Sequence, residues 1–167
     1  FLFAGTATAQ VAVSATAESP VHFANTDDFS AGTLTITFNM PAGKTAAQVE
    51  VTLATGIEYI ANSASITGGA VTLDPSATNT KPVFNITAAS STAVTLQIKR
   101  KVTKAAMTKL GKGESFSDAI KLTVTGSGTA NGNSNVYKLP IPVFTVQVAP
   151  KHDNASGTSS QTFTILN

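Results

Sequence analysis

The sequence predicts an all-β fold in which antiparallel strands pack as a sandwich or barrel. Apolar and polar residues alternate with a period of two in five segments, which gives each strand one face for a core and one for water. Residues that favour turns separate these segments at short intervals. Only 12% of residues are charged, about half the usual share, so the polar surface must be largely Thr, Ser, Asn and Gln. One-sided burial and many threonines are both typical of antiparallel sheets.

The five strongest strand segments each carry apolar residues that we expect to face the core, while their Thr, Gln, Glu and Lys neighbours face solvent. The inward sets are Leu34, Ile36 and Phe38; Val49, Val51 and Leu53; Val94, Leu96 and Ile98; Ile120, Leu122 and Val124; and Phe144, Val146 and Val148. Shorter apolar stretches predict weaker strands at 11–13, 21–23, 57–60, 71–73, 83–86 and 163–165.

Turn chemistry marks the boundaries between these strands. The expected turns are Ala31-Gly32, Pro41-Ala42-Gly43, Gly68-Gly69 and Asp74-Pro75-Ser76. The polar stretch Gly126–Asn135, which contains Asn131-Gly132, predicts a flexible loop or a long hairpin tip. Pro140 and Pro142 have no N–H to give to a ladder, so the residues around them should form a sheet edge or a crossing.

One segment breaks the β pattern. Thr103–Leu110 is rich in helix-forming residues and is followed by Gly111, a good helix terminator. It predicts a helix of one or two turns that crosses between the sheets near 103–110. Met107 and Leu110 are three residues apart, so both can face the core as packing residues.

The two ends of the sequence differ from the middle. Phe1–Gly5 is apolar, and Ala7-Thr8-Ala9 has the small-x-small pattern of a signal-peptide cleavage site, which would make Gln10 the mature N-terminus. An apolar first strand is the alternative. Residues 150–160 have the composition of a linker, and 163–166 form a last strand or the start of another module. We therefore expect a signal remnant at 1–9, a sandwich at 10–149, and a linker with a final strand at 150–167. No segment is apolar for long enough to predict a membrane span.

The inventory of catalytic residues is small. The chain has no cysteine, which excludes thiolate chemistry, and its histidines, His22 and His152, lie near opposite ends. His152 and Asp153 are adjacent but fall in the expected linker, and His22 is interpreted as an ordinary strand residue. Glycoside hydrolysis needs two carboxylates facing each other, and no pair stands out. The carboxylates are Glu18, Asp27, Asp28, Glu50, Glu58, Asp74, Glu114, Asp118 and Asp153. We predict no catalytic residue and no enzyme activity.

Binding motifs are equally sparse. Asn25–Asp28 gathers oxygen ligands, but it lacks the spacing of an EF-hand, and a turn is preferred to a calcium site. Gly126-Ser127-Gly128 leads into no helix, so it is not a phosphate-binding loop. Lys99-Arg100-Lys101 is the only dense basic run, and we interpret it as a solvated strand end rather than a nucleic-acid site. We expect no metal and no cofactor.

Two tyrosines bear on glycan binding, because sugar rings often stack on exposed aromatic side chains. Tyr59 lies among expected core residues, whereas Tyr137 follows the polar stretch and is the better candidate for exposure. A carbohydrate-binding module, or the accessory domain of a secreted hydrolase, is therefore the alternative function.

The stretch Val49–Gly69 resembles DUF11, an Ig-like β-sandwich repeat of long bacterial surface proteins. The family pattern is a strand, Leu-Pro-x-Gly-hydrophobic-x-Tyr/Phe, a Ser-rich strand and a glycine turn. Leu53–Tyr59 matches this pattern except that Ala54 replaces the proline. Residues 32–38, 84–100 and 115–126 resemble the flanking strands, so the resemblance covers about residues 30–126.

The resemblance implies an Ig-like sandwich with a buried Tyr59, a Gly56 turn and no catalytic residues. It implies a structural or adhesive module of an exported cell-surface protein, in the manner of the Bacteroidota gliding-motility adhesins. Its expected partners are neighbouring domains or other surface proteins, or else glycans or a surface, with no nucleic acid and no membrane span.

Overall fold

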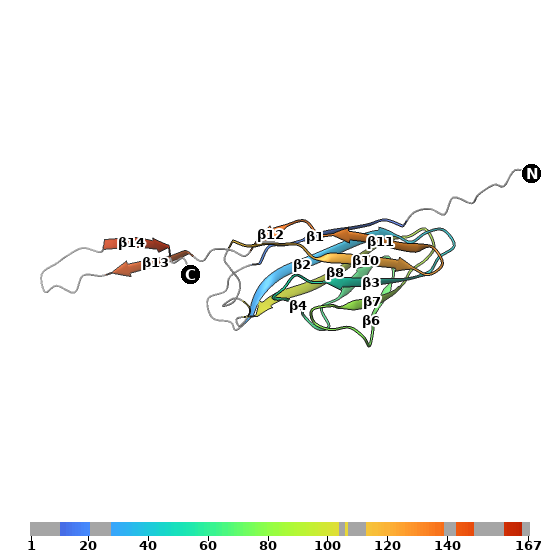
Figure 1. Ribbon diagram of the computed structural model, residues 1–167, viewed down its shortest axis with the longest axis horizontal. Coiled ribbons are helices and arrows are strands. Elements are labelled where there is room, and N and C mark those ends of the chain that lie inside the picture. The colour runs from blue at the N-terminus through green and yellow to red at the C-terminus, as the bar shows by residue number, and fades with distance from the viewer. Residues whose placement is uncertain are drawn as a thin grey trace, which may run out of the picture.

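The chain forms two five-stranded antiparallel sheets that pack face to face (Figure 1). The computed structural model describes residues 11–20, 28–103, 106, 113–138, 143–148 and 159–164. Two smaller strand pairs accompany the sheets. They are β9 (Ser115–Phe116) with β12 (Tyr137–Lys138), and β13 (Val143–Val148) with β14 (Ser159–Thr164).

The first sheet has the order β1-β2-β8-β4, and β5 also pairs with β8. Its strands are β1 (Val13–Ala17), β2 (Asp28–Asn39), β8 (Ala93–Thr103), β4 (Ile57–Tyr59) and β5 (Ser65–Thr67). The second sheet has the order β11-β10-β3-β7-β6. Its strands are β11 (Gly128–Asn133), β10 (Ala119–Val124), β3 (Ala46–Thr52), β7 (Val83–Thr87) and β6 (Ala70–Leu73).

The core lies between the two sheets and is made of the inward side chains that the period-two pattern predicts. All the predicted inward residues of the segments near 34, 49, 94 and 120 are buried, and the least covered of them, Leu53, is 6% exposed. Tyr59 is buried and packs edge-on against Phe84, with ring centroids 5.5 Å apart. The all-β sandwich is therefore confirmed.

The two sheets are connected at both edges of the sandwich. At one edge, Gly68 and Gly69 join β5 of the first sheet to β6 of the second. At the other, β1 pairs with β2 and also makes a single parallel bridge, Ala15 to Ser134, to the chain that follows β11. Strand edges that are covered in this way expose fewer unpaired backbone groups.

The turn expected at Ala31-Gly32 is wrong, because both residues lie inside β2. The register between β2 and β8 shifts between Ser30 and Thr33, and Gly32 has φ of 69°. This is a β-bulge, in which an extra residue bends one strand of an antiparallel pair. Glycine suits the position because its φ is in the left-handed region.

The long polar loop expected at 126–135 is also wrong. Residues 128–133 form β11, which pairs with β10 through six residues. The turn is short and lies at 125–127, where Ser127 N–H donates to Val124 O at 3.0 Å. Polar residues form a strand here because β11 is at the edge of its sheet and four of its six residues are exposed.

Several other expectations fall near the limits of the described residues. β8 extends through Thr103, the first residue of the expected helix, and Ala106 has helical backbone. Other predictions concern residues outside the described ones, namely Met107, Leu110, the Pro140–Pro142 crossing, the strand at 21–23 and the signal remnant at 1–9. The expected strand at 11–13 is found as β1, which begins at Val13. β13 pairs with β14 rather than with either large sheet. In the part of the chain that the structure describes, no helix has the length and hydrophobicity of a membrane span.

Candidate functional site

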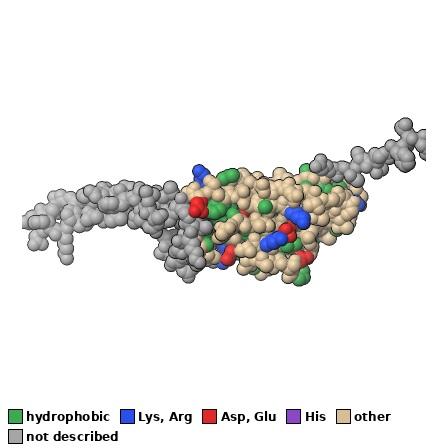
Figure 2. Space-filling model, viewed as in Figure 1, with side chains coloured by type: hydrophobic (Ala, Val, Ile, Leu, Met, Phe, Trp, Pro, Cys, Tyr) green, Lys and Arg blue, Asp and Glu red, His purple; other side chains and the backbone are tan. Residues whose placement is uncertain are grey.

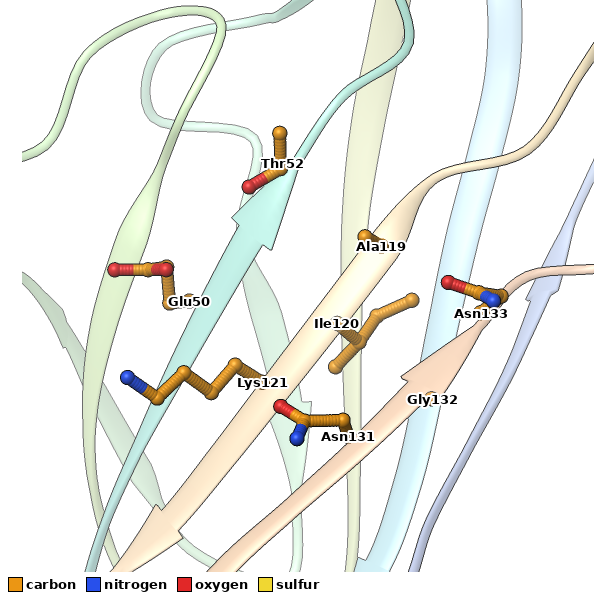
Figure 3. Close-up of a pocket in the computed structure, with 8 residues that line it drawn as sticks. All are labelled: Glu50, Thr52, Ala119, Ile120, Lys121, Asn131, Gly132 and Asn133. Atoms are coloured by element: carbon orange, nitrogen blue, oxygen red, sulfur yellow. The ribbon is translucent and has the colours of Figure 1, made fainter.

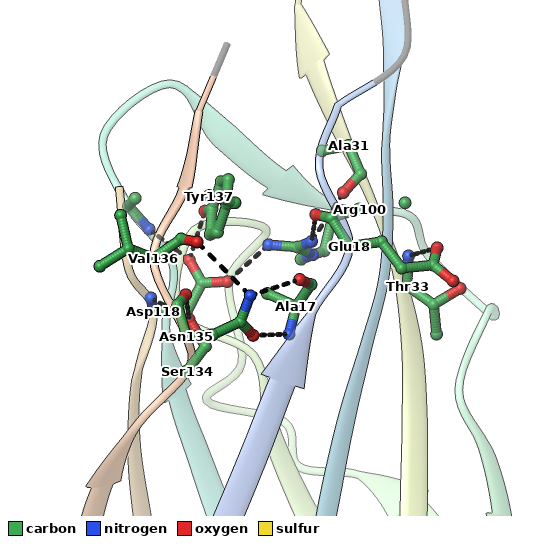
Figure 4. Close-up of polar contacts among 12 residues, drawn as sticks. Ala17, Glu18, Ala31, Thr33, Arg100, Asp118, Ser134, Asn135, Val136 and Tyr137 are labelled. Atoms are coloured by element: carbon green, nitrogen blue, oxygen red, sulfur yellow. Dashed lines mark hydrogen bonds and ion pairs between the residues drawn. The ribbon is translucent and has the colours of Figure 1, made fainter. Parts of the chain in front are cut away.

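Arg100 is the centre of a buried polar cluster at one end of the sandwich (Figure 4). It lies on β8 in the inward phase of Ile98 and Val102, and it is fully buried. Its Nη1 donates to Asp118 Oδ2 at 2.6 Å, and its Nη2 donates to the backbone oxygens of Glu18 at 2.7 Å and Ala31 at 2.6 Å. Among the described residues, its Nε has no hydrogen-bond partner. The guanidinium thus joins β8, the end of β1 and the bulge of β2.

Asp118 balances the charge of Arg100 from the second sheet. It directly precedes β10 and is fully buried. Its Oδ1 accepts hydrogen bonds from Ala54 N–H at 2.9 Å and from Tyr137 O–H at 2.8 Å. Ala54 stands where the DUF11 pattern has proline, which has no N–H to donate. An alanine rather than a proline at this position therefore makes one of the contacts of the carboxylate possible.

Tyr137 closes the cluster from β12. It is 2% exposed, its ring centroid lies 4.6 Å from the Arg100 Cζ, and its ring is 6.0 Å from that of Phe116. Burial, and then the negative charge of Asp118, raise the pKa of the Tyr137 hydroxyl well above its ordinary value. The expectation that Tyr137 is exposed for sugar stacking is wrong, because its hydroxyl has a partner in the core.

Asn135 ties the last segment of the sandwich to β1. Its Oδ1 accepts from Ala17 N–H at 2.6 Å, and its Nδ2 donates to Ala17 O at 3.0 Å. This amide side chain therefore pairs with Ala17 as a strand neighbour would. Next in the chain, the Glu18 carboxylate accepts from Thr33 N–H at 2.6 Å, which fixes the end of β1 to β2.

The arrangement of this cluster favours a structural role. Each carboxylate oxygen of Asp118 is occupied by a donor from another part of the chain, and neither Asp118 nor Arg100 is accessible to solvent. A substrate in solution has no route to these groups in this conformation. The cluster instead joins the two sheets at one end of the sandwich.

Shallow depressions occur on the described part of the surface, and two of them are lined by residues of β11. One, of about 420 Å³, runs across β3, β10 and β11, where Glu50, Lys121 and Asn131 lie in a row (Figure 3). Glu50 is its single carboxylate and is paired with Lys81 at 3.1 Å. The other, of about 650 Å³, is lined by residues 11–13 and 129–131 and contains no titratable side chain. Neither depression brings two carboxylates together, and the described residues contain no group of three or more His, Cys, Asp or Glu that could hold a metal ion.

The other predicted site residues are dispersed. Lys99 is exposed and Lys101 lies 3.9 Å from Glu58, as expected of a solvated strand end. Arg100, which lies between them in the sequence, is buried, so the prediction of a solvated basic run is wrong for this residue. Asp74 begins the expected turn, where hydrogen bonds from Ser76 lower the pKa of its carboxyl. Glu114 is exposed. His22, Asp27, His152 and Asp153 lie outside the described residues, as does the side chain of Asp28.

One sequence signal could have located the ion pair. Arg100 continues the inward phase of Val94, Leu96 and Ile98, and Asp118 continues that of Ile120 and Leu122. Opposite charges in the inward phase of two strands predict a buried pair, because buried charges are paired. For Tyr137 and Asn135 no such periodicity exists, because the structure around them is irregular.

Uncharged polar side chains and backbone dominate the face seen in Figure 2, where charged groups occur as isolated spots. The low share of charged residues in the sequence produces this surface.

The fold is similar to domains of bacterial surface proteins of known structure. Full-length SpaD, the major pilin of Corynebacterium diphtheriae, matches with a TM-score of 0.51 and 13% identity over 86% of this chain and 39% of SpaD. BcpA, the major pilin subunit of Bacillus cereus, matches with 0.52 and 10% identity over 83% of this chain and 42% of BcpA. The N-terminal domain of the Streptococcus gordonii adhesin Sgo0707 matches with 0.50 and 13% identity over 78% of this chain and 32% of that one.

These matches establish the sandwich fold. The chain spans about two fifths of the length of either pilin and about a third of the adhesin domain. No family model and no curated protein matches the sequence.

Proposed function

We propose that this chain is a non-catalytic structural or adhesive module of an exported bacterial surface protein, where it acts as a stiff spacer. The observation that carries the proposal is the position of the two ends of the sandwich. β1 starts at one end of the long axis and β12 lies at the other (Figure 1). A sandwich entered and left at opposite ends adds its full length to a chain of domains.

The internal construction supports this role. The buried cluster joins both sheets and fixes β1 to the last segment, so the module should resist bending and fraying at its ends. The fold likeness to pilins and to an adhesin domain also supports it, because those proteins are, by their names, parts of surface appendages or adhesins.

The narrower form of the proposal uses the DUF11 resemblance. Residues 49–69 contain the end of β3, the turn at 55–56, β4, β5 and the start of the glycine corner, in the order of the repeat pattern. We propose that residues 1–9 are the remnant of a secretion signal, and that the module is displayed on the cell surface, where it contacts neighbouring domains or other surface proteins. The most specific form of this proposal is that the module belongs to a gliding-motility adhesin.

Glycan binding is less well supported. Both tyrosines are buried, and there is no tryptophan in the sequence, so neither residue type offers the platform on which sugars commonly stack. The depression around Glu50 and Lys121 has polar groups but no aromatic side chain.

Replacement of the module in its native gene would test the proposal. An antibody raised against residues 11–138 should label intact cells, and deletion of these residues should reduce attachment to surfaces. Replacement by an unrelated sandwich of the same length should restore attachment if the module is a spacer, but not if it binds a ligand. Failure to label intact cells while labelling lysed ones would contradict surface display.

A further inference from the structure

We infer that the Ala17–Asn135 pairing, anchored by Arg100, is a mechanical clamp that sets the tension the sandwich withstands along its long axis. The inference deepens the spacer role and rests on it, because a spacer in a surface protein is pulled through its two ends. It concerns residues far apart in sequence that meet at one place in the fold (Figure 4).

The directions of the two segments create a shear geometry. The bridge between Ala15 and Ser134 is parallel, so β1 and the segment after β11 run the same way. Tension pulls β1 back by its N-terminal end and pulls residues 134–138 forward by their C-terminal end. The segments must then slide past each other, because each is pulled along its own axis.

The contacts that hold β1 in place lie across that axis, as Figure 4 shows for the bonds between Asn135 and Ala17. Interstrand hydrogen bonds in an antiparallel pair are perpendicular to the strands, and the five-residue pairing of β1 with β2 is of this kind. The two Asn135 bonds to Ala17 join the other side of β1 directly to the pulled C-terminal segment. Sliding therefore strains these bonds together rather than one after another.

Arg100 keeps the clamp from yielding at its weakest point, the end of β1. It holds Glu18 O and Ala31 O with one nitrogen, so the residue after β1 is fixed to the bulge of β2. Arg100 is fully buried and Ala17 is 4% exposed, so water has little access to the Arg100 bonds, whereas the side chain of Asn135 is itself exposed and its bonds to Ala17 are only partly buried. The Glu18 carboxylate, which accepts from Thr33 N–H at 2.6 Å, adds a further link between the end of β1 and β2.

Single-molecule stretching of the full chain, held by its two ends, tests the inference. Unfolding of the sandwich should lengthen the tether by roughly 40 nm, the extended length of the residues between β1 and β12. Asn135→Ala removes both bonds to Ala17 and should raise the unfolding rate at a given force about ten-fold. Gln48→Ala is the matched control. It removes an exposed amide that donates to Asn85 at 3.0 Å on the second sheet, and it should change the rate by less than about two-fold.

A second pulling direction separates a clamp from general destabilisation. The chain has no cysteine, so cysteines at the exposed Ala42 and Ala61 can serve as anchors that leave β1 and residues 134–138 outside the loaded segment. Asn135→Ala should then lose most of its effect. An equal rate increase in both directions, or equal effects of Asn135→Ala and Gln48→Ala, would overturn the clamp.

If Asn135→Ala does not fold, Asn135→Asp tests the same contact, because it keeps the acceptor for Ala17 N–H, loses the donor, and places a negative oxygen against Ala17 O. It should weaken the end-to-end direction selectively, and no selective change would refute the inference. These measurements use isolated protein, so their failure would leave surface display untouched, and failed surface labelling would leave the clamp result standing.

Discussion

Arg100 and Asp118 form a fully buried ion pair that connects the two sheets, with Nη1 and Oδ2 2.6 Å apart. Arg100 belongs to β8 of the first sheet and Asp118 directly precedes β10 of the second. Burial of two charges is costly, and their attraction repays that cost only when hydrogen bonds satisfy the remaining groups. Asp118 meets this condition through Ala54 and Tyr137, whereas one nitrogen of Arg100 remains without a partner among the described residues.

We expect Asp118→Asn to destabilise the protein by about 3–5 kcal/mol, because it leaves the Arg100 charge buried and uncompensated. Urea unfolding at neutral pH measures the loss. The control is Glu50→Gln, which breaks the exposed pair with Lys81 and should cost less than about 1 kcal/mol. Similar losses of unfolding free energy for the two variants would show that the buried ion pair contributes no more to stability than the exposed one.

The raised pKa of Tyr137 predicts a loss of stability in strong base. The hydroxyl keeps its proton in the folded state above pH 10, where an unfolded tyrosine releases it. The contribution of Tyr137 to the free energy of unfolding is therefore fully present below about pH 10. It decreases as pH rises toward the pKa of Tyr137 in the folded protein, by at most about 1.4 kcal/mol per pH unit.

Tyr137→Phe isolates this effect, because the variant lacks the titrating hydroxyl. It should be less stable than the native protein by about 1–3 kcal/mol at pH 8, since Asp118 loses a donor. The difference in unfolding free energy should narrow between pH 10 and 12. A difference that stays constant over that range would contradict the assigned burial of the hydroxyl.

Phe38→Ala should destabilise the sandwich by about 3–5 kcal/mol, the usual loss for a truncated core phenylalanine. Phe38 is 5% exposed and faces the space between the sheets. Thr52→Ala, at the exposed end of β3, should stay within about 0.5 kcal/mol. Thermal or urea unfolding of both variants checks which face of the strand is buried. A loss of unfolding free energy below about 1 kcal/mol for Phe38→Ala would show that Phe38 does not face the core.

Gly68→Ala should prevent closure of the corner between β5 and β6. Gly68 has φ of 84°, and an added Cβ would lie 2.1 Å from Ala93 O, a backbone atom that has no freedom to move aside. Gly43→Ala is the matched control, because Gly43 has φ of 72° but nothing within 4 Å of the same position. The control should cost about 1–2 kcal/mol from backbone strain alone. Equal stability of the two variants would show that the contact with Ala93 is unimportant.

Local pattern located most of the strands and their inner faces correctly. The alternation around Leu34, Val49, Leu96 and Leu122 assigned each residue to its face, because successive side chains of a strand point to opposite sides whatever the strand packs against. The turns at 41–43 and 74–76 were also predicted correctly, since proline, glycine and aspartate favour such turns by their own conformations.

The alternation of residues was enough to predict an all-β chain with an apolar core between polar outer faces. The burial of Arg100 and Tyr137, the bulge at Ala31-Gly32 and the strand at 128–133 are evident only in the folded protein. These outcomes depend on partners distant in the chain, such as Asp118 for Arg100 and Ala17 for Asn135. A polar residue is stable in the core only where a partner completes its hydrogen bonds. The local sequence around the residue does not identify that partner.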